Sequence, residues 1–233
     1  MKIKLLLILA LISIKTIAQT PITTLEVENG SVYTILNSTN PLDETTNGAN
    51  VIWNFDNLTV IGDNIISNAT PTASELLTFP NSTNVVESLA SINAVQTTSK
   101  LYTKTVGTTF SITGLNNTEL DLNFATNNAT IGTLPMAYGY SNTDTMAGTY
   151  VFGTYSGTLS GTVTSSVDAY GILSLNNLAF NPANVTRLKS VQNISLNYQI
   201  FPNVGTIVQT TYAYYNQTPG MSAPIFRSSV TTI

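Results

Sequence analysis

The sequence of 233 residues contains no cysteine and no histidine, and only 9 % of its residues are charged. The missing histidine excludes imidazole acid–base catalysis and the Ser-His-Asp triad. The missing cysteine excludes thiol nucleophiles and disulfide bonds, and the two absences together leave no thiolate or imidazole ligand for a metal ion. The sequence also lacks a Ser-x-x-Lys pattern and a glycine-rich phosphate loop. We therefore expect no catalytic residues, no cofactor and no metal site.

Small polar residues are abundant instead, with 38 threonines, 26 asparagines and 21 serines, beside an apolar fraction of 42 %. Low charge combined with a normal apolar content argues against disorder. The chain is therefore expected to fold around a hydrophobic core.

Two lysines precede the apolar run Leu5 to Ile14, and small residues follow up to Ala18. This order is typical of a secretory signal peptide, so we expect a signal peptide at residues 1–18 and a single secreted β domain at residues 19–233. The run is too short to span a bilayer, which takes about 20 apolar residues. No later segment is apolar enough to do so, and the protein is not expected to be an integral membrane protein. The domain keeps five cations against twelve carboxylates, a formal charge of −7, which leaves no basic surface for nucleic acid.

Glycine, proline, asparagine and aspartate separate short runs that are rich in valine, isoleucine, threonine and tyrosine, a pattern typical of strands and turns. The longest alternation of polar and apolar residues, Thr154 to Thr164, predicts a half-buried strand. Residues Ser165 to Gly171 are expected to form a turn, with Ile172 to Leu175 returning as the partner strand. Asn29-Gly30 predicts a hairpin with a type I′ turn. The predicted fold is all-β, an antiparallel β-sandwich that is jelly-roll-like or barrel-like, with few or no long helices.

Eleven tyrosines are the best indication of a binding surface. The candidate binding residues are Tyr212, Tyr214 and Tyr215, on one predicted strand. Tyr212 and Tyr214 share a face and Tyr215 points the other way, so at least one ring should be accessible if one face is core. Exposed rings of this kind stack on sugars or bind another protein.

Two groups of side chains have oxygen atoms in arrangements known from glycosidases or from Ca²⁺ sites. Glu119 and Asp121 lie two apart on a predicted strand, about 7 Å from each other, a spacing found in paired-carboxylate glycosidases. Asp43, Glu44 and Asn47 crowd a predicted turn, where oxygen ligands can hold Ca²⁺. For Glu119 and Asp121, the favoured interpretation is that they lie on the solvent-exposed face of a strand. For Asp43, Glu44 and Asn47, it is an ordinary Asx turn.

Five segments carry a resemblance to a known family: Gly48–Phe55, Val167–Leu173, Val185–Lys189, Tyr212–Tyr215 and Pro224–Arg227. Together they resemble secreted β domains of Bacteroidota that stand ahead of a type IX secretion sorting domain. Asn54 occupies the position after the tryptophan where that family has aspartate. The sequence ends at Ile233, about where a sorting domain would begin. The resemblance implies export and brings no catalytic residue with it, and Trp53 is expected to be a core residue.

The function that the sequence favours is a non-enzymatic secreted or cell-surface β domain for adhesion, surface structure or protein binding. Its partner would be a protein or a glycan at the cell surface. One alternative is a carbohydrate-binding module that uses exposed tyrosines. A second alternative is a carboxylate-dependent enzyme acting on glycans, which would use a pair such as Glu119 and Asp121.

Overall fold

The computed structural model describes residues 19–175, 180–216 and 223–233, so the predicted signal peptide lies outside the described residues. Within these ranges the chain forms thirteen strands and one short helix, α2 (Ala73–Thr78), and the all-β prediction is confirmed. The strands are β1 (Val32–Ser38), β2 (Gly48–Phe55), β3 (Leu58–Ala69), β4 (Asn84–Ile92), β5 (Val95–Val106), β6 (Thr109–Asn116), β7 (Leu120–Asn127), β8 (Ala129–Thr133), β9 (Ser141–Phe152), β10 (Tyr155–Leu175), β11 (Ala183–Tyr198), β12 (Phe201–Asn216) and β13 (Pro224–Thr232).

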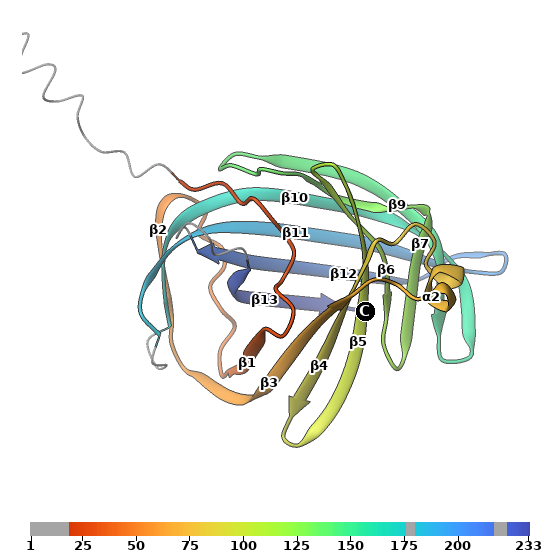
Figure 1. The fold of residues 1–233 in the computed structure, drawn as a ribbon, viewed down its shortest axis with the longest axis horizontal. Helices are drawn as coiled ribbons and strands as arrows, with labels where there is room; N and C mark the ends of the chain where they lie inside the picture. Colours follow the sequence, from red (N-terminus) through yellow and green to blue (C-terminus); the bar gives the residue numbers. More distant parts are fainter. Residues whose placement is uncertain (1–18, 176–179, 217–222) are drawn as a thin grey trace, which may run out of the picture.

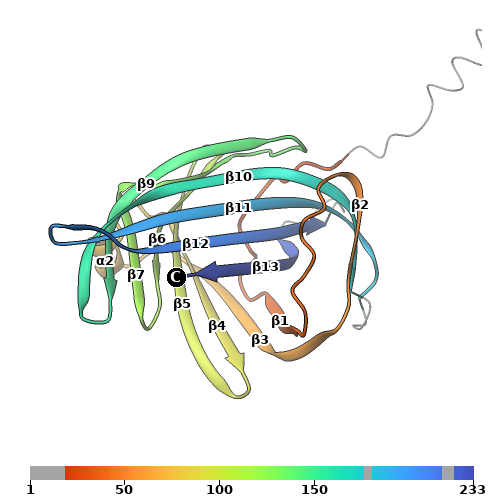
Figure 2. The ribbon, with the colours of Figure 1, turned by 180° about the vertical axis from the view of Figure 1, so that it is seen from behind.

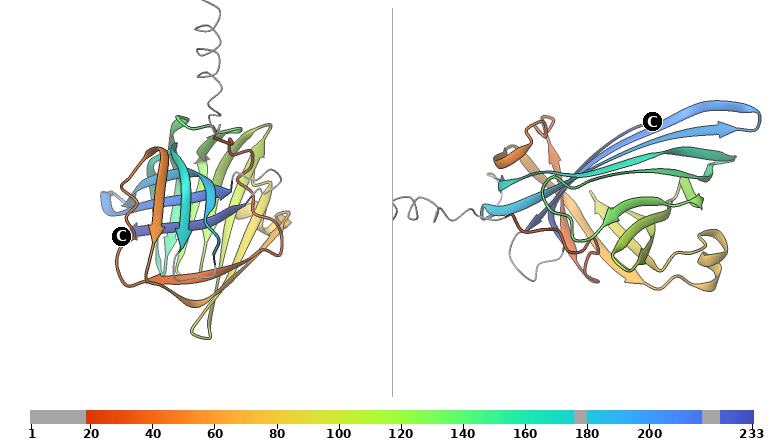
Figure 3. Two further views of the ribbon diagram at one scale, coloured as in Figure 1. Left: turned by 90° about the vertical axis from the view of Figure 1, so that its left-hand side faces the viewer. Right: turned by 90° about the horizontal axis from the view of Figure 1, so that it is seen from above.

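All thirteen strands belong to one open sheet, in the order β1-β3-β4-β5-β6-β7-β9-β10-β11-β12-β13. Two strands lie off this path, β2 beside β10 and β8 beside β6. The described pairs are antiparallel except for β2 with β10, which is parallel. The sheet is strongly curved, so that the long strands β9–β13 and the strands β3–β6 form two facing layers of a single sheet (Figure 1, Figure 2 and Figure 3).

The concave face of the sheet encloses the larger hydrophobic core. Side chains from β6 to β12 meet there, and Phe124, Met146 and Val163 are each at most 1 % exposed. Residue Ile22, which precedes β1, pairs with Met136 and also enters this core. The N-terminal segment therefore packs against the concave face.

Strand β10 is 21 residues long and supplies two cores in succession. The prediction of a turn at Ser165 to Gly171 is wrong, because β10 continues through these residues to Leu175. The register against β11 shifts between Val167 and Ala169, which is a β-bulge at Asp168. Up to Val167 the odd-numbered side chains face the larger core, and from Ala169 onwards they face a second one. Apolar residues therefore stay at odd-numbered positions along the whole strand, but after the bulge these positions point to the opposite face of the sheet.

The second core lies where β2 pairs with the end of β10. Strand β9 covers the first part of that edge of β10, and β2 covers the rest in parallel register. Trp53 and Phe55 of β2 pack there with Leu173 and Tyr214. Trp53 is 2 % exposed, so its predicted core position is confirmed.

The turn at Asn29-Gly30 is present, but it does not join two strands of a hairpin. Ser31 N–H donates to the Glu28 carbonyl (3.2 Å), and Gly30 has a φ of 82°. Asn29 has no positive φ, so the turn is not of type I′. Gly30 N–H instead donates to Ile66 of β3 (2.8 Å). In the described ranges, no helix has the length and apolar character needed to cross a membrane.

Candidate functional site

A buried polar cluster lies at the end of the sheet where β2 joins β10. Its centre is Arg187 on β11, which is 1 % exposed. The β-bulge in β10 places Asp168 beside it, since Ala169 is the residue directly opposite Arg187. In the sequence, Arg187 and Lys189 alternate around Leu188, which predicts that Leu188 points inward, that Arg187 points outward and that Arg187 pairs with Asp168. The pairing is confirmed. The prediction of an outward-facing Arg187 is wrong, because both faces of β11 are covered here: Leu188 enters the larger core, and Arg187 lies beside the second one.

The guanidinium of Arg187 is held from several sides. Its Nε donates to Oδ1 of Asp168 and its Nη2 donates to Oδ2, both at 2.9 Å, which is the bidentate geometry that arginine favours with carboxylates. It also donates to the backbone carbonyls of Glu44 (3.1 Å) and Thr46 (2.9 Å) in the β1–β2 loop. Burial is the largest single influence on the pKa of Arg187 and lowers it, but the interactions with Asp168 and Tyr214 together outweigh burial, so the pKa is raised.

Aromatic rings cover the guanidinium on its remaining sides. The Cζ atom of Arg187 lies 5.0 Å from the ring centroid of Trp53 and 4.8 Å from that of Tyr212. Both distances are within the range of a cation–π contact. The indole Nε1 of Trp53 is buried and has no hydrogen-bond partner among the described residues.

Glu44 links the β1–β2 loop to β12 and β13. Its carboxylate lies 3.5 Å from Nη1 of Arg187 and accepts hydrogen bonds from the hydroxyls of Tyr214 and Ser228. Burial, and then the nearby charge of Glu44, raise the pKa of Tyr214 well above its usual value. The phenol therefore stays protonated and acts as a donor to Glu44.

The cluster is closed, because each of its charged groups already has partners inside the protein. Arg187 pairs with both Asp168 and Glu44, and the rings of Trp53 and Tyr212 exclude water from the guanidinium. Its arrangement fastens the β1–β2 loop to β10–β13. It is a structural clamp, and it offers no free acid or base to a substrate.

The predicted binding tyrosines lie around this clamp, and two of them are buried. Tyr214 is 0 % exposed in the second core, and Tyr215 is 8 % exposed in the larger core on the opposite face of β12. Burial raises the pKa of Tyr215 well above its usual value. Tyr212 keeps partial exposure, but its ring contacts Arg187 and lies 5.5 Å from the amine of Lys189. The assumption that one face of β12 is free fails because the strand has a core on each face.

The structure does not bring Glu119 and Asp121 together as a pair on one strand. Glu119 lies exposed in the turn before β7, and Asp121 accepts a hydrogen bond from the Asn116 amide. Asp43 forms the expected Asx turn, accepting from the backbone N–H of Thr45 at 3.0 Å. Glu44 points away from that turn into the clamp. The described residues contain no group of three or more acidic side chains placed to hold a metal ion.

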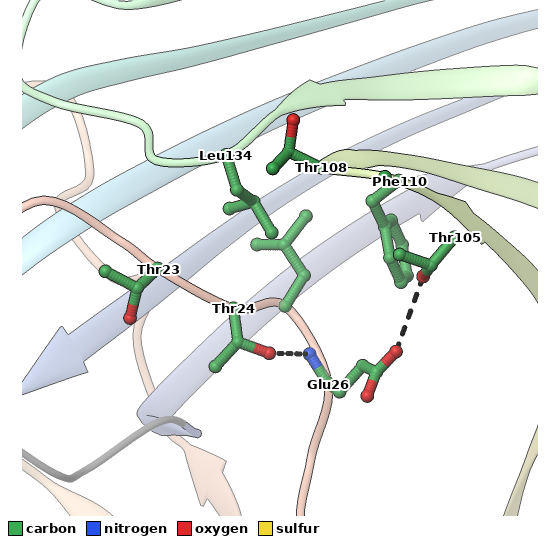
Figure 4. Close-up of a pocket in the computed structure, with 9 residues that line it drawn as sticks. Thr23, Thr24, Glu26, Thr105, Thr108, Phe110 and Leu134 are labelled. Carbon is green, nitrogen blue, oxygen red and sulfur yellow. Dashed lines mark hydrogen bonds between the residues drawn. The ribbon is translucent and has the colours of Figure 1, made fainter.

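A shallow cleft of about 250 Å³ lies between the N-terminal segment and the β5–β6 turn (Figure 4). Glu26 is the one titratable side chain among the residues that line it. Its carboxylate reaches the hydroxyl of Thr105 (3.4 Å), and its backbone N–H donates to Thr24 (3.1 Å). The cleft therefore lacks the second group that acid–base chemistry needs. Its lining residues are Thr23, Thr24, Leu25, Glu26, Thr105, Gly107, Thr108, Phe110 and Leu134.

Large apolar side chains are exposed at the far end of the long strands, in the β9–β10 and β11–β12 hairpins. We call them the hairpin-end surface. Their exposed fractions lie between 43 % and 86 %. Both hairpins reach the right-hand end of the molecule in Figure 1. The members are Val151, Phe152, Tyr155, Ile200, Phe201 and Val204.

The sequence does not reveal this surface, because strand alternation is the same whether an apolar face is covered or open. Strand β10 was correctly predicted around Leu159 and Val163, yet Tyr155 on the same face is 59 % exposed. The β11–β12 hairpin projects beyond the facing layer (Figure 3), whereas β7 pairs with β9 as far as Phe152. The one usable signal is the absence of charge along both hairpins.

Comparison of the chain with protein-family models, with curated proteins and with solved structures finds no match. The resemblance of its motifs to secreted domains of Bacteroidota therefore stays a prediction. The five segments that carry it meet in the structure, on the neighbouring strands β2, β10, β11, β12 and β13.

Proposed function

We propose that this chain is a non-enzymatic secreted or cell-surface β domain that acts by binding protein, in adhesion or in surface structure. The observation that carries the proposal is the hairpin-end surface. The largest exposed apolar patch of a monomeric protein is typically about 300–600 Å² and is often an interaction site. Ile200 is 86 % exposed and Phe201 56 %, at the end of a hairpin that projects from the body (Figure 3).

The surroundings of the acidic side chains favour the same proposal. Asp168 and Glu44 are occupied by Arg187, and Glu119 lies in an exposed turn. A glycosidase needs two carboxyl groups that flank one bond in a concave site. The cleft of Figure 4 contains a single carboxylate, that of Glu26.

The carbohydrate-binding alternative is less well supported. Stacking on a flat sugar ring favours coplanar exposed aromatics. The tyrosine pairs near the surface are edge-to-face, at 78° for Tyr155 with Tyr198 and 75° for Tyr138 with Tyr170. The buried Tyr214 and Tyr215 offer no ring face at all.

An activity screen tests the proposal. The purified domain is incubated with polysaccharides and chromogenic esters, and products are followed by reducing ends and by absorbance. We expect no turnover above buffer. Turnover that disappears in a Glu119→Gln or Asp121→Asn variant would replace the proposal with the carboxylate enzyme, and turnover unaffected by both would place an activity elsewhere.

A further inference from the structure

Phe152, Tyr155 and Phe201 lie on one face of the two hairpins of the hairpin-end surface and form a patch with Ile200 at the adjoining turn, whereas Val151 and Val204 point to the opposite face of their strands. Thr158 of β10 is paired with Asn197 of β11, so the hairpin turns on either side lie next to each other. The rings of Tyr155 and Tyr198 meet edge-to-face with centroids 5.9 Å apart, which joins the β9–β10 hairpin to the β11–β12 hairpin. Phe152 pairs with Tyr155, and Phe201 with Tyr198, within the hairpins.

The patch carries no charge. No charged residue occurs between Asp144 and Asp168 or between Lys189 and Arg227 in the sequence, and both hairpins lie inside these stretches. Glu119 borders the patch from the β7 side, where its backbone carbonyl accepts a hydrogen bond from Gly153 (3.2 Å). On a domain with a formal charge of −7, this end can therefore approach a second negative molecule with the least repulsion.

The size of the patch is close to that of one side of a protein interface. When the exposed fractions of Phe152, Tyr155, Ile200 and Phe201 are applied to typical residue areas, the four expose on the order of 500 Å². A standard interface buries about 800 Å² on each partner. Exposed residues between them, such as Thr154, Pro202 and Asn203, supply the rest.

We infer that the hairpin-end surface is covered by the same surface of a second copy of this chain, in a two-fold symmetric dimer. The inference rests on the proposed function, because it names the partner of the binding surface. In a two-fold symmetric dimer the same patch of both copies meets across the interface. A charged patch would therefore face a patch of the same charge, whereas an uncharged apolar patch meets no such repulsion. A lipid surface fits less well, because a peripheral anchor gains from cations near its apolar residues and this patch has none.

Sedimentation velocity of the folded domain across micromolar concentrations tests the inference. The wild type is expected to shift from monomer to dimer, and the double variant Ile200→Ser/Phe201→Ser is expected to raise the dissociation constant by about thirtyfold or more. Val95→Ser is the matched control, because Val95 is 65 % exposed at the end of another hairpin. It should dimerise like the wild type. Sodium chloride should leave the dimer intact, and sulfate should strengthen it.

Three outcomes would overturn the inference. One is a wild type that stays monomeric at every concentration. Another is a dimer that Ile200→Ser/Phe201→Ser leaves unchanged. The last is a monomer that floats with phosphatidylcholine vesicles unless the two residues are replaced, which would assign the surface to lipid. A monomer without turnover in the activity screen would leave protein binding as the proposed function, whereas turnover would contradict that function whatever the oligomeric state.

Discussion

Asp168 and Arg187 form a bidentate ion pair across β10 and β11, at the bulge where β10 passes from one core to the other. The bulge turns the carboxylate toward the arginine, and the arginine in turn holds the β1–β2 loop through the carbonyls of Glu44 and Thr46. The pair thus joins a local irregularity of one strand to the packing of a distant loop. We therefore expect this ion pair to contribute to the free energy of unfolding.

Replacing Arg187 by methionine removes the cation and leaves Asp168 and Glu44 without their partner in a buried site. We expect a loss of about 3–5 kcal/mol in the free energy of unfolding, measured by urea denaturation. Lys189→Met is the control on the same strand, because Lys189 is only half-buried, and it should change stability by about 0.5 kcal/mol or less. Equal stabilities for the two variants would contradict the clamp.

Glycine at position 171 is required by the close approach of β2 to β10. A Cβ there would lie 1.8 Å from the backbone oxygen of Val51. Gly171→Ala should therefore displace β2 and cost about 2–3 kcal/mol in thermal or urea unfolding. At Gly205 the nearest heavy atom to an added Cβ is 3.7 Å away, on Leu196, so Gly205→Ala should be tolerated. A Gly171→Ala protein as stable as Gly205→Ala would refute the parallel pairing.

Tyr214→Phe removes the hydroxyl that donates to the buried carboxylate of Glu44 while it keeps the ring against Trp53 and Phe55. We expect a loss of about 1–3 kcal/mol in stability, because the carboxylate loses a donor. Binding through the hairpin-end surface should be unchanged. If Tyr214→Phe instead lost partner binding at full stability, the tyrosine would have to be a ligand contact after all.

Acid should weaken the attachment of helix α2. The Glu75 carboxylate accepts hydrogen bonds from Thr72 at the helix N-terminus and from Lys100, and these lower its pKa to about 2. Since the folded pKa lies below the ordinary value of 4.5, Glu75 contributes stability above about pH 4.5, and that stability is lost as the pH falls toward 2. Glu75→Gln should lose stability at pH 7 and flatten the dependence between pH 4.5 and 2, measured by urea titrations. If Glu75→Gln left the pH dependence of the free energy of unfolding unchanged between pH 4.5 and 2, the lowered pKa of Glu75 would be contradicted.

The strands were predictable because successive side chains of a pleated strand point to opposite faces, which produces an alternation of polar and apolar residues in the sequence. Tyr212, Tyr214 and Tyr215 were predicted to share one strand and lie within β12. Gly157, on the apolar face of the predicted strand Thr154 to Thr164, makes room for the ring of Tyr150. The beginning of helix α2 is likewise marked in the sequence, by Thr72 and Glu75.

The candidate site was less predictable, because it depends on contacts between distant segments. The bulge at Asp168 adds one residue without breaking the apolar alternation, so the second core and the burial of Arg187 leave no local signal. Tyr214 and Tyr215 point to opposite faces, as predicted, yet the sequence could not show that both faces are covered. The openness of Phe201 also depends on where the facing layer ends.

Thiol crosslinking tests most directly the claim that the hairpin ends are the functional surface, because the chain has no cysteine of its own. Asn203 and Asn93 are comparable sites, because both are exposed and have a positive φ, 53° and 49°. Asn203 lies near the start of β12, where the register against β11 shifts, and Asn93 lies in the β4–β5 turn. A short bis-maleimide should link Asn203→Cys into dimers at micromolar concentration and leave Asn93→Cys monomeric. Equal yields at the two sites, or no crosslinked dimer at Asn203→Cys, would contradict the account.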